Sequence, residues 1–219
     1  MEKIIKMNIQ TFLKILDILE QNIPQNTPAY TLKNSYKRNP YTILMVTLLS
    51  LRSKDGKTAI VASKLFNDIQ TPQELLKLTQ NELEEIIKPI GFQKQKAKTL
   101  LEVSKVLIEK YNLQVPDDKE ELLSIKGIGE KTANIVLNNA FGIGSIAVDT
   151  HVHRLTNMWG VVDTKSFDES SKVLNEIIPK EYKSKLNFTL VSFGQTICTV
   201  KNPKCEICKI KIYCKENNE

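Results

Sequence analysis

Two closely spaced glycines between two helical patterns constrain this chain most. One apolar pattern at helical spacing ends near Lys126, and a second begins near Glu130. Between them stand Gly127 and Gly129, and residues without a Cβ let the backbone reverse tightly. The segment therefore predicts two helices joined by a glycine hairpin.

The hairpin has two interpretations. It can be a packing unit whose glycines only bring two helices close together. It can also be a binding element, because it presents free backbone N–H groups at a helix N-terminus. The helix dipole there favours an anion such as a phosphate.

Lys131 falls in the first turn of the second helix, where the helix dipole disfavours a cation. Partial burial would act in the same direction, because burial also disfavours a charged amine. Both effects favour the neutral amine, which is the nucleophile that Schiff-base chemistry requires. The alternative is a solvated surface lysine, which is common in a chain with 31 lysines and arginines.

Asp149 precedes Thr150-His151-Val152-His153-Arg154, a segment typical of a helix start. The simplest role for this aspartate is an N-cap that accepts hydrogen bonds from unpaired N–H groups. A carboxylate held rigidly at a helix start can also stabilise a developing cation or accept a proton. Both roles stay open.

Phe92 stands beside a glycine turn and is flanked by three lysines at positions 94, 96 and 98. An isolated aromatic residue usually faces the core. The alternative is a wedge that enters a stack of bases.

All four cysteines lie within loop 198–214, spaced as C-x6-C-x2-C-x5-C. Four thiolates so close together are enough for one metal site. Zinc sites usually use two tight pairs, whereas this run has one tight pair and two longer arms. The spacing favours an iron–sulfur cluster over zinc. The ligands would be Cys198, Cys205, Cys208 and Cys214.

The rest of the chain is dominated by apolar residues at helical spacing, so the predicted fold class is all-α. Further helices are expected at about 8–20, from Pro40, and at 57–68, 72–79, 82–89, 94–110, 166–179 and 182–197. The proline-bearing segment between the first two is the best candidate for a lobe boundary.

The net charge of +6 suits a polyanionic partner, although lysine-rich chains are often basic for solubility alone. No apolar run approaches the length of a membrane span, and the N-terminus lacks the features of a signal peptide. We therefore expect an intracellular protein, acting in the cytoplasm and at the nucleoid, with no membrane partner.

Three motifs together resemble endonuclease III, a family of DNA repair enzymes in the helix-hairpin-helix glycosylase superfamily. They are LLSIKGIGEKTANIVLNNAFG, IAVDTHVHR and C-x6-C-x2-C-x5-C. The likeness extends to LLS-x-x-SKD at 48–55 and IGFQKQKA at 90–97. It therefore covers nearly the whole chain from about residue 38.

The resemblance implies a bilobal all-α fold that holds DNA in a cleft between its lobes. Residues 33–143 would form a six-helix barrel. Residues 1–32 and 144–219 would form a discontinuous second lobe that carries a [4Fe–4S] cluster, with the four cysteines as its ligands. By position, Lys131 matches the catalytic nucleophile and Asp149 the catalytic aspartate. DNA contacts are implied for Lys126, Gly127, Ile128, Gly129, Thr132, Arg52, Phe92 and His151.

The activity implied is that of a bifunctional, monomeric enzyme on double-stranded DNA with damaged bases or abasic sites. The damaged base is rotated out of the duplex. Lys131 then displaces it from the sugar, and the Schiff base permits β-elimination. Oxidised pyrimidines such as thymine glycol are the expected substrates.

Three residues depart from the family's pattern. Lys126 stands where proline is common, Phe92 where leucine is common, and Arg52 where a glutamine usually fills the space of the flipped base. Arg52 keeps open a glycosylase for uracil or thymine mispaired with guanine, although Lys131 favours a lyase. A third possibility is a non-catalytic DNA-binding module, which would bind DNA without nicking it.

Overall fold

The computed structural model describes residues 7–24 and 26–214, and their secondary structure is entirely helical. The all-α prediction is therefore confirmed. The chain divides into two compact units, Pro28–Ile143 and a discontinuous unit of Met1–Thr27 with Gly144–Glu219. No helix in the described ranges is long and apolar enough to cross a bilayer.

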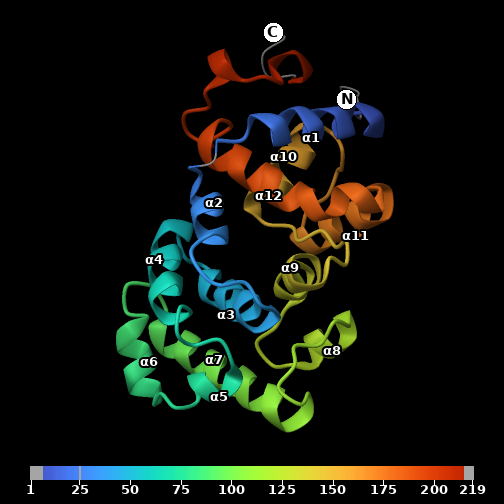
Figure 1. Cartoon of the computed structure of the whole chain (residues 1–219). Coiled ribbons are helices and arrows are strands. Elements are labelled where there is room, and N and C mark those ends of the chain that lie inside the picture. The colour runs from blue at the N-terminus through green and yellow to red at the C-terminus, as the bar shows by residue number, and fades with distance from the viewer. Residues whose placement is uncertain (1–6, 25, 215–219) are drawn as a thin grey trace. The chain divides into compact units, whose positions relative to one another are not determined.

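The unit Pro28–Ile143 is built around α3 (Pro40–Ser50), which packs against α4, α7 and α9 (Figure 1). Every residue of α3 from Tyr41 to Leu49 is buried. A helix that is apolar on all sides needs neighbours on all sides, which explains its central position. The other helices are α2 (Pro28–Lys33), α4 (Asp55–Leu65), α5 (Pro72–Leu75), α6 (Gln80–Ile86), α7 (Gln93–Lys110), α8 (Lys119–Ser124) and α9 (Glu130–Phe141).

The N-terminus of α3 is fixed by a reciprocal cap. The side chain of Asn39 accepts a hydrogen bond from the Thr42 N–H at 2.8 Å, and the Thr42 hydroxyl accepts one from the Asn39 N–H at 3.0 Å. Pro40 occupies the first helical position, where its missing N–H costs no hydrogen bond. The turn after α3 therefore starts from a rigid, buried helix.

The discontinuous unit contains α1 (Ile9–Asn22), α10 (Thr150–Met158), α11 (Phe167–Ile177) and α12 (Lys180–Thr196). Two short 3₁₀ helices, Cys205–Ile207 and Lys211–Tyr213, follow in the cysteine loop. α12 packs against both α1 and α10. The Trp159 ring lies 6.1 Å from the ring of Phe12 and 6.1 Å from that of Phe193. These aromatic contacts join α1 to α12 through Trp159, the residue that follows α10.

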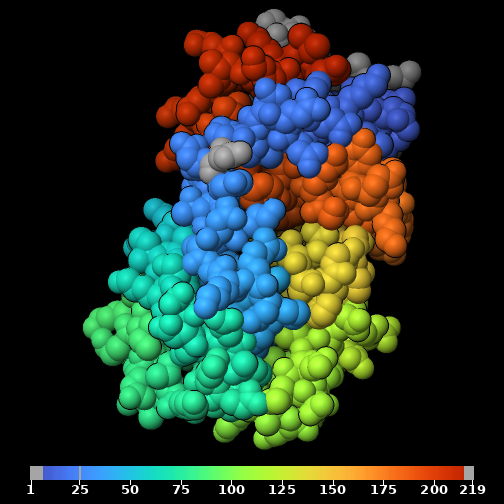
Figure 2. Space-filling model, viewed as in Figure 1, coloured from blue at the N-terminus to red at the C-terminus, as the bar shows by residue number. Residues whose placement is uncertain are grey.

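Figure 2 shows the C-terminal loop, in red, covering one end of this unit next to α1, in blue. The N-terminal helix and the cysteine loop are thus neighbours, although almost the whole chain separates them in sequence.

Two helices differ from the sequence-based expectation. Helix α2 begins at Pro28, inside the segment predicted to be a connection. The helix predicted for 72–79 ends at Leu75, because Thr79 caps the next helix through a reciprocal bond with Glu82. A capping threonine needs extended backbone, so it cannot also lie inside the preceding helix.

Candidate functional site

The glycine hairpin joins α8 to α9, and its turn needs glycine. The Ile128 N–H donates to the Ile125 carbonyl at 3.0 Å, which closes the turn. Gly127 has a φ of +99°, in the left-handed region that favours glycine. A Cβ at Gly127 would also lie only 2.8 Å from Cγ2 of Thr99, a residue of α7. The hairpin therefore rests directly on α7.

The amides at the start of α9 face no side-chain cap. Gly129 is the N-cap residue, and no side chain of its own is available to accept their hydrogen bonds. Ile128 is only 5% exposed and Thr132 only 1%, so neither side chain is placed to contact a ligand. The geometry fits the anion-binding interpretation of the hairpin.

Lys131 is exposed, in the first turn of α9. Its side chain is therefore not partly buried, so the additional effect that burial would have on the amine is absent here. The residue before it, Glu130, forms an ion pair with Lys119 at 2.7 Å. Lys131 is thus accessible to a substrate, and it stands beside amides suited to a phosphate.

Asp149 is the N-cap residue of α10, as the sequence predicted. Its Oδ1 accepts hydrogen bonds from the N–H groups of His151 at 3.0 Å and Val152 at 2.9 Å. These bonds hold the half-buried carboxylate in one orientation. His151 lies against Gly194 of α12, where a Cβ would overlap the imidazole ring. Asp149 and Lys131 belong to different units, and each is described within its own.

Arg52 and Phe92 share an unusual backbone. Their φ angles are +53° and +63°, and both residues are exposed, Phe92 to 61%. Left-handed backbone costs a residue with a Cβ roughly 1–2 kcal/mol. Such strain is often found at functional positions. The core-facing interpretation of Phe92 is wrong, and the wedge interpretation fits its exposure.

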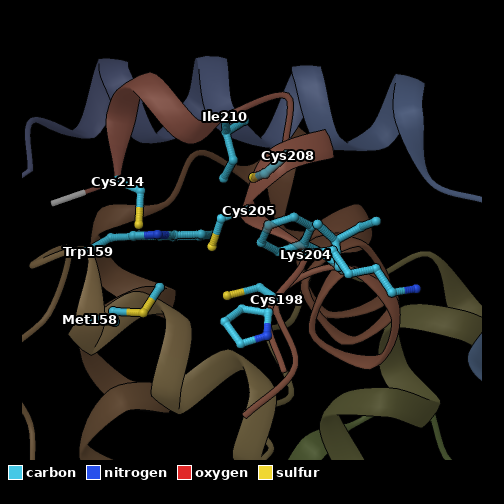
Figure 3. Close-up of a pocket in the computed structure, with 11 residues that line it drawn as sticks. Met158, Trp159, Cys198, Lys204, Cys205, Cys208, Ile210 and Cys214 are labelled. Carbon is cyan, nitrogen blue, oxygen red and sulfur yellow. The ribbon is translucent and has the colours of Figure 1, made fainter. Parts of the chain in front are cut away.

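The four cysteines line one pocket in the discontinuous unit, and none forms a disulfide. Figure 3 shows their side chains around a shared space with Trp159 at its side. Met158, Phe193 and Ile210 complete a mostly apolar lining. Burial raises the pKa of the Cys198 and Cys208 thiols. Thiolates are therefore disfavoured in this pocket unless a positive centre binds them.

Arg154 supports this pocket from α10, although no motif predicted a role for it. Its guanidinium donates to the carbonyl oxygen of Cys198 and lies 3.7 Å from the Cys198 sulfur. The first cysteine is thereby tied to the helix that Asp149 begins.

The donor set of the pocket fits an iron–sulfur cluster. In residues 7–24 and 26–214, no three His, Cys, Asp or Glu side chains are arranged as ligands of one metal ion. A cubane makes a different demand, because each of its four irons takes its own cysteine and the ligands enclose a larger body. Four cysteines around one apolar pocket meet that demand.

Comparison with known proteins agrees with this geometry. Residues 45–180 match the model of the HhH-GPD superfamily of base excision DNA repair proteins. The endonuclease III of Thermotoga maritima is 42% identical over 182 residues, which are 83% of this chain and 85% of the relative.

Solved structures extend the likeness to the fold. A trapped covalent intermediate of endonuclease III with DNA has a TM-score of 0.84 at 33% identity, covering 97% of this chain and 98% of the other. A thermostable thymine-DNA glycosylase has a TM-score of 0.83 at 24% identity, covering 95% and 96%. The second likeness concerns the fold alone. The chain belongs to the endonuclease III family, in the helix-hairpin-helix superfamily of base excision DNA repair proteins.

Proposed function

We propose that this chain removes oxidised pyrimidines such as thymine glycol from double-stranded DNA, with Lys131 as its nucleophile and Asp149 as its catalytic carboxylate. Its family makes it a base excision repair enzyme, with DNA glycosylase and abasic-site lyase activity. The observation that carries the residue assignment is the exposed Lys131 beside the uncapped amides of α9.

Binding begins at the hairpin. The N–H groups around Gly127 and Gly129 hold one backbone phosphate without reading the base sequence. Lys126, exposed beside them, adds a positive charge. Phe92 enters the base stack, and Arg52 fills the space that the flipped base leaves.

The chemical step follows from the two charged residues. The neutral amine of Lys131 forms a bond to C1′ of the sugar, and the bond between C1′ and the base breaks with its electron pair going to the base. Asp149 accepts a proton from the amine and stabilises the positive charge that develops at the sugar. The C1′–O4′ bond then breaks with its electron pair going to O4′, which takes up a proton, and the C1′–nitrogen adduct becomes a Schiff base. Loss of the C2′ proton then expels the 3′ phosphate and nicks the strand.

Borohydride reduction tests the nucleophile, because it converts the Schiff base into a stable covalent link. The wild-type chain should cross-link to a duplex that contains thymine glycol, and Lys131→Ala should not. Lys105→Ala is the matched control, because Lys105 is an exposed lysine of α7. A Lys131→Ala protein that still cross-links and nicks at the normal rate would show that the nucleophile is another residue.

We propose that Cys198, Cys205, Cys208 and Cys214 hold a [4Fe–4S] cluster. When bound, the cluster supplies a structural cross-link for loop 198–214 and a centre that can sense DNA. Purified protein should be brown and contain iron. Stoichiometric zinc in anaerobically purified protein would contradict this assignment.

We propose the domain division that the resemblance implies, with a barrel over 33–143 and a cluster lobe of 1–32 with 144–219. The enzyme would work as a monomer on DNA at the nucleoid, and His151 would contribute a DNA contact beside Asp149. Gel filtration with light scattering tests the oligomeric state.

Arg52 supports a second candidate substrate. An exposed guanidinium at the place of the flipped base can donate to the O6 and N7 acceptors of an orphaned guanine. Excision of uracil or thymine opposite guanine would use that contact. A side-by-side assay of thymine glycol, G·T and G·U duplexes decides between the two substrate classes. A passive DNA-binding role, without catalysis, does not fit a member of this enzyme family.

A further inference from the structure

One of the three lysines beside Phe92 is not a surface residue. Lys94 and Lys98 are exposed, whereas Lys96 is only 8% exposed. Its side-chain nitrogen donates to the carbonyl oxygen of Leu49 at 2.8 Å and to the hydroxyl of Ser53 at 2.5 Å. The sequence alone grouped it with its exposed neighbours.

The two acceptors of Lys96 lie on either side of Arg52. Leu49 is in the last turn of α3, where carbonyl groups lack partners within the helix and the dipole favours a cation. Ser53 follows Arg52, and its N–H closes the turn by donating to the Ser50 carbonyl at 3.0 Å. The Lys96 amine therefore spans the strained turn that presents Arg52.

The backbone of Lys96 holds the other strained turn. Its backbone N–H donates to the carbonyl oxygen of Phe92 at 3.0 Å. This bond joins the first turn of α7 to its N-cap residue. Phe92 is the N-cap of α7, and no side-chain hydrogen bond supports it there. One residue thus bonds to the turns of both exposed residues expected to enter the duplex.

This arrangement has an energetic cost that packing alone does not explain. Burial lowers the pKa of Lys96 to about 8, and no neighbouring carboxylate contributes to that value. An apolar side chain would fill the same space without desolvating an amine. What an apolar side chain cannot do is satisfy the Leu49 carbonyl and the Ser53 hydroxyl together.

We propose that Lys96 is a positioning residue that fixes Arg52 relative to Phe92, so that both enter the duplex together as the damaged base rotates out. The inference rests on the proposed roles of Arg52 and Phe92 in base flipping. Lys96 itself touches no DNA, and it acts through the two turns.

The proposal distinguishes two reactions of the same enzyme. Excision of thymine glycol paired with adenine requires the damaged base to be rotated out of the duplex. Cleavage of a preformed abasic site has no base to expel. Loss of Lys96 should therefore slow the first reaction much more than the second.

The test uses the full-length chain with its cluster and the variant Lys96→Met, which keeps the volume but removes the donors. Single-turnover excision of thymine glycol should fall about tenfold or more, as expected for about 1.4 kcal/mol in the barrier. Cleavage of the abasic duplex should stay within about threefold, a difference of less than 1 kcal/mol. The fluorescence change of 2-aminopurine beside the lesion, which reports unstacking, should slow in parallel with excision.

Two further variants isolate the role of the amine. Lys98→Met is the matched control, because Lys98 lies on the same helix, is exposed and forms a surface ion pair with Glu102. It should leave the ratio of the two rates unchanged. Lys96→Arg keeps hydrogen-bond donors at this position and should restore most of the rate of the 2-aminopurine fluorescence change.

Several results would overturn the proposal. One is a Lys96→Met protein with normal excision and fluorescence, while Lys131→Ala abolishes cross-linking; the proposed function would then stand alone. Another is an equal fall in both reactions together with a lower melting temperature, which is the mark of a merely structural residue. A wild-type chain that excises no base at all would instead remove the proposed function on which the inference rests.

If Lys96→Met does not fold, Ser53→Ala takes its place, because it removes one acceptor and leaves the amine on Leu49. It should slow the fluorescence phase several-fold with the abasic rate unchanged. An unaltered fluorescence phase in this variant would contradict the proposal.

Discussion

Two helix N-termini in this molecule differ in how the unpaired N–H groups of their first turns are satisfied. At α10, the carboxylate of Asp149 accepts hydrogen bonds from the first amides, so that helix start is satisfied by the protein itself. At α9, Gly129 has no side chain to do so, and the amides stay available for a ligand. The chain keeps a fixed anion where a sugar cation would develop, and an open anion position where a phosphate would bind.

A third helix end, the C-terminus of α3, can be compared with these two N-termini. The C-terminus of α3 is filled by the buried amine of Lys96, a cation at the negative end of the dipole. Each of these ends lies next to a residue proposed to meet DNA. At α10 and α3, the group that satisfies the helix end thus also belongs to the proposed site or positions it, whereas the start of α9 stays open to a ligand.

The largest expected effect comes from separating the two roles of Asp149. Asparagine also caps helices well, so Asp149→Asn should change the unfolding free energy by less than about 1 kcal/mol. It removes the negative charge, and single-turnover base excision should fall by about 10²- to 10⁴-fold. Urea unfolding and excision assays measure the two effects. A variant that keeps the wild-type rate would leave Asp149 as a cap alone.

Gly129→Asp would convert the start of α9 into a copy of the start of α10. The new carboxylate should cap the helix and raise the unfolding free energy by about 0.5 kcal/mol. It should also repel the phosphate and weaken DNA binding by about tenfold or more. Nothing lies within 4 Å of a Cβ at this position, so no steric effect confuses the result. Fluorescence anisotropy with an abasic analogue gives the affinity.

Gly129→Ser is the matched control for charge, because serine caps without a carboxylate. Its effect on affinity should be clearly smaller than that of Gly129→Asp. Equal losses for both variants would mean that the amides, rather than the charge, account for the effect.

Gly127→Ala should break the hairpin sterically. Its positive φ and the close approach to Thr99 predict a loss of about 2 kcal/mol in unfolding free energy and a several-fold loss of DNA affinity. Gly142→Ala is the control, because Gly142 has a φ of +68° at the other end of α9 but open space around its Cβ. It should destabilise the protein without changing affinity. Equal affinity losses in both variants would count against the hairpin as the phosphate site.

A further prediction concerns pH. The pKa of Lys96 is lowered from its ordinary 10.5 to about 8 by burial. Between these values the unfolded chain holds the proton and the folded chain does not, so the unfolding free energy of the wild type should rise with pH across that window. Lys96→Met should lack this contribution. Identical pH slopes for the two proteins, measured by urea unfolding, would contradict the buried amine.

Much of this molecule could be predicted from local sequence patterns. The hairpin, the cap at Asp149 and the buried helix from Pro40 each depend on residues within a turn or two of one another. Features that depend on residues far apart in the sequence could not be predicted in this way. The burial of Lys96 depends on Leu49, which is 47 residues away in sequence, and no periodicity reports such a partner.

Exposure was harder to predict than element type. Phe92 is an apolar residue at the surface, and Lys96 is a charged residue in the interior, the reverse of the usual preferences. Both exceptions lie in the first turn of α7 or its cap. Departures of this kind concentrate where a protein sacrifices some stability for a specific geometry.

The aromatic contacts of Trp159 with Phe12 and Phe193 have a consequence for how the chain is made. On the ribosome, Phe12 emerges long before its ring partner Trp159 has been synthesised, at roughly 5–20 residues per second. The first helix therefore waits roughly 7–30 s for this aromatic partner. The unit Pro28–Ile143 is contiguous in sequence and can fold within that interval. The order of synthesis thus delivers the hairpin first and the cysteine pocket last.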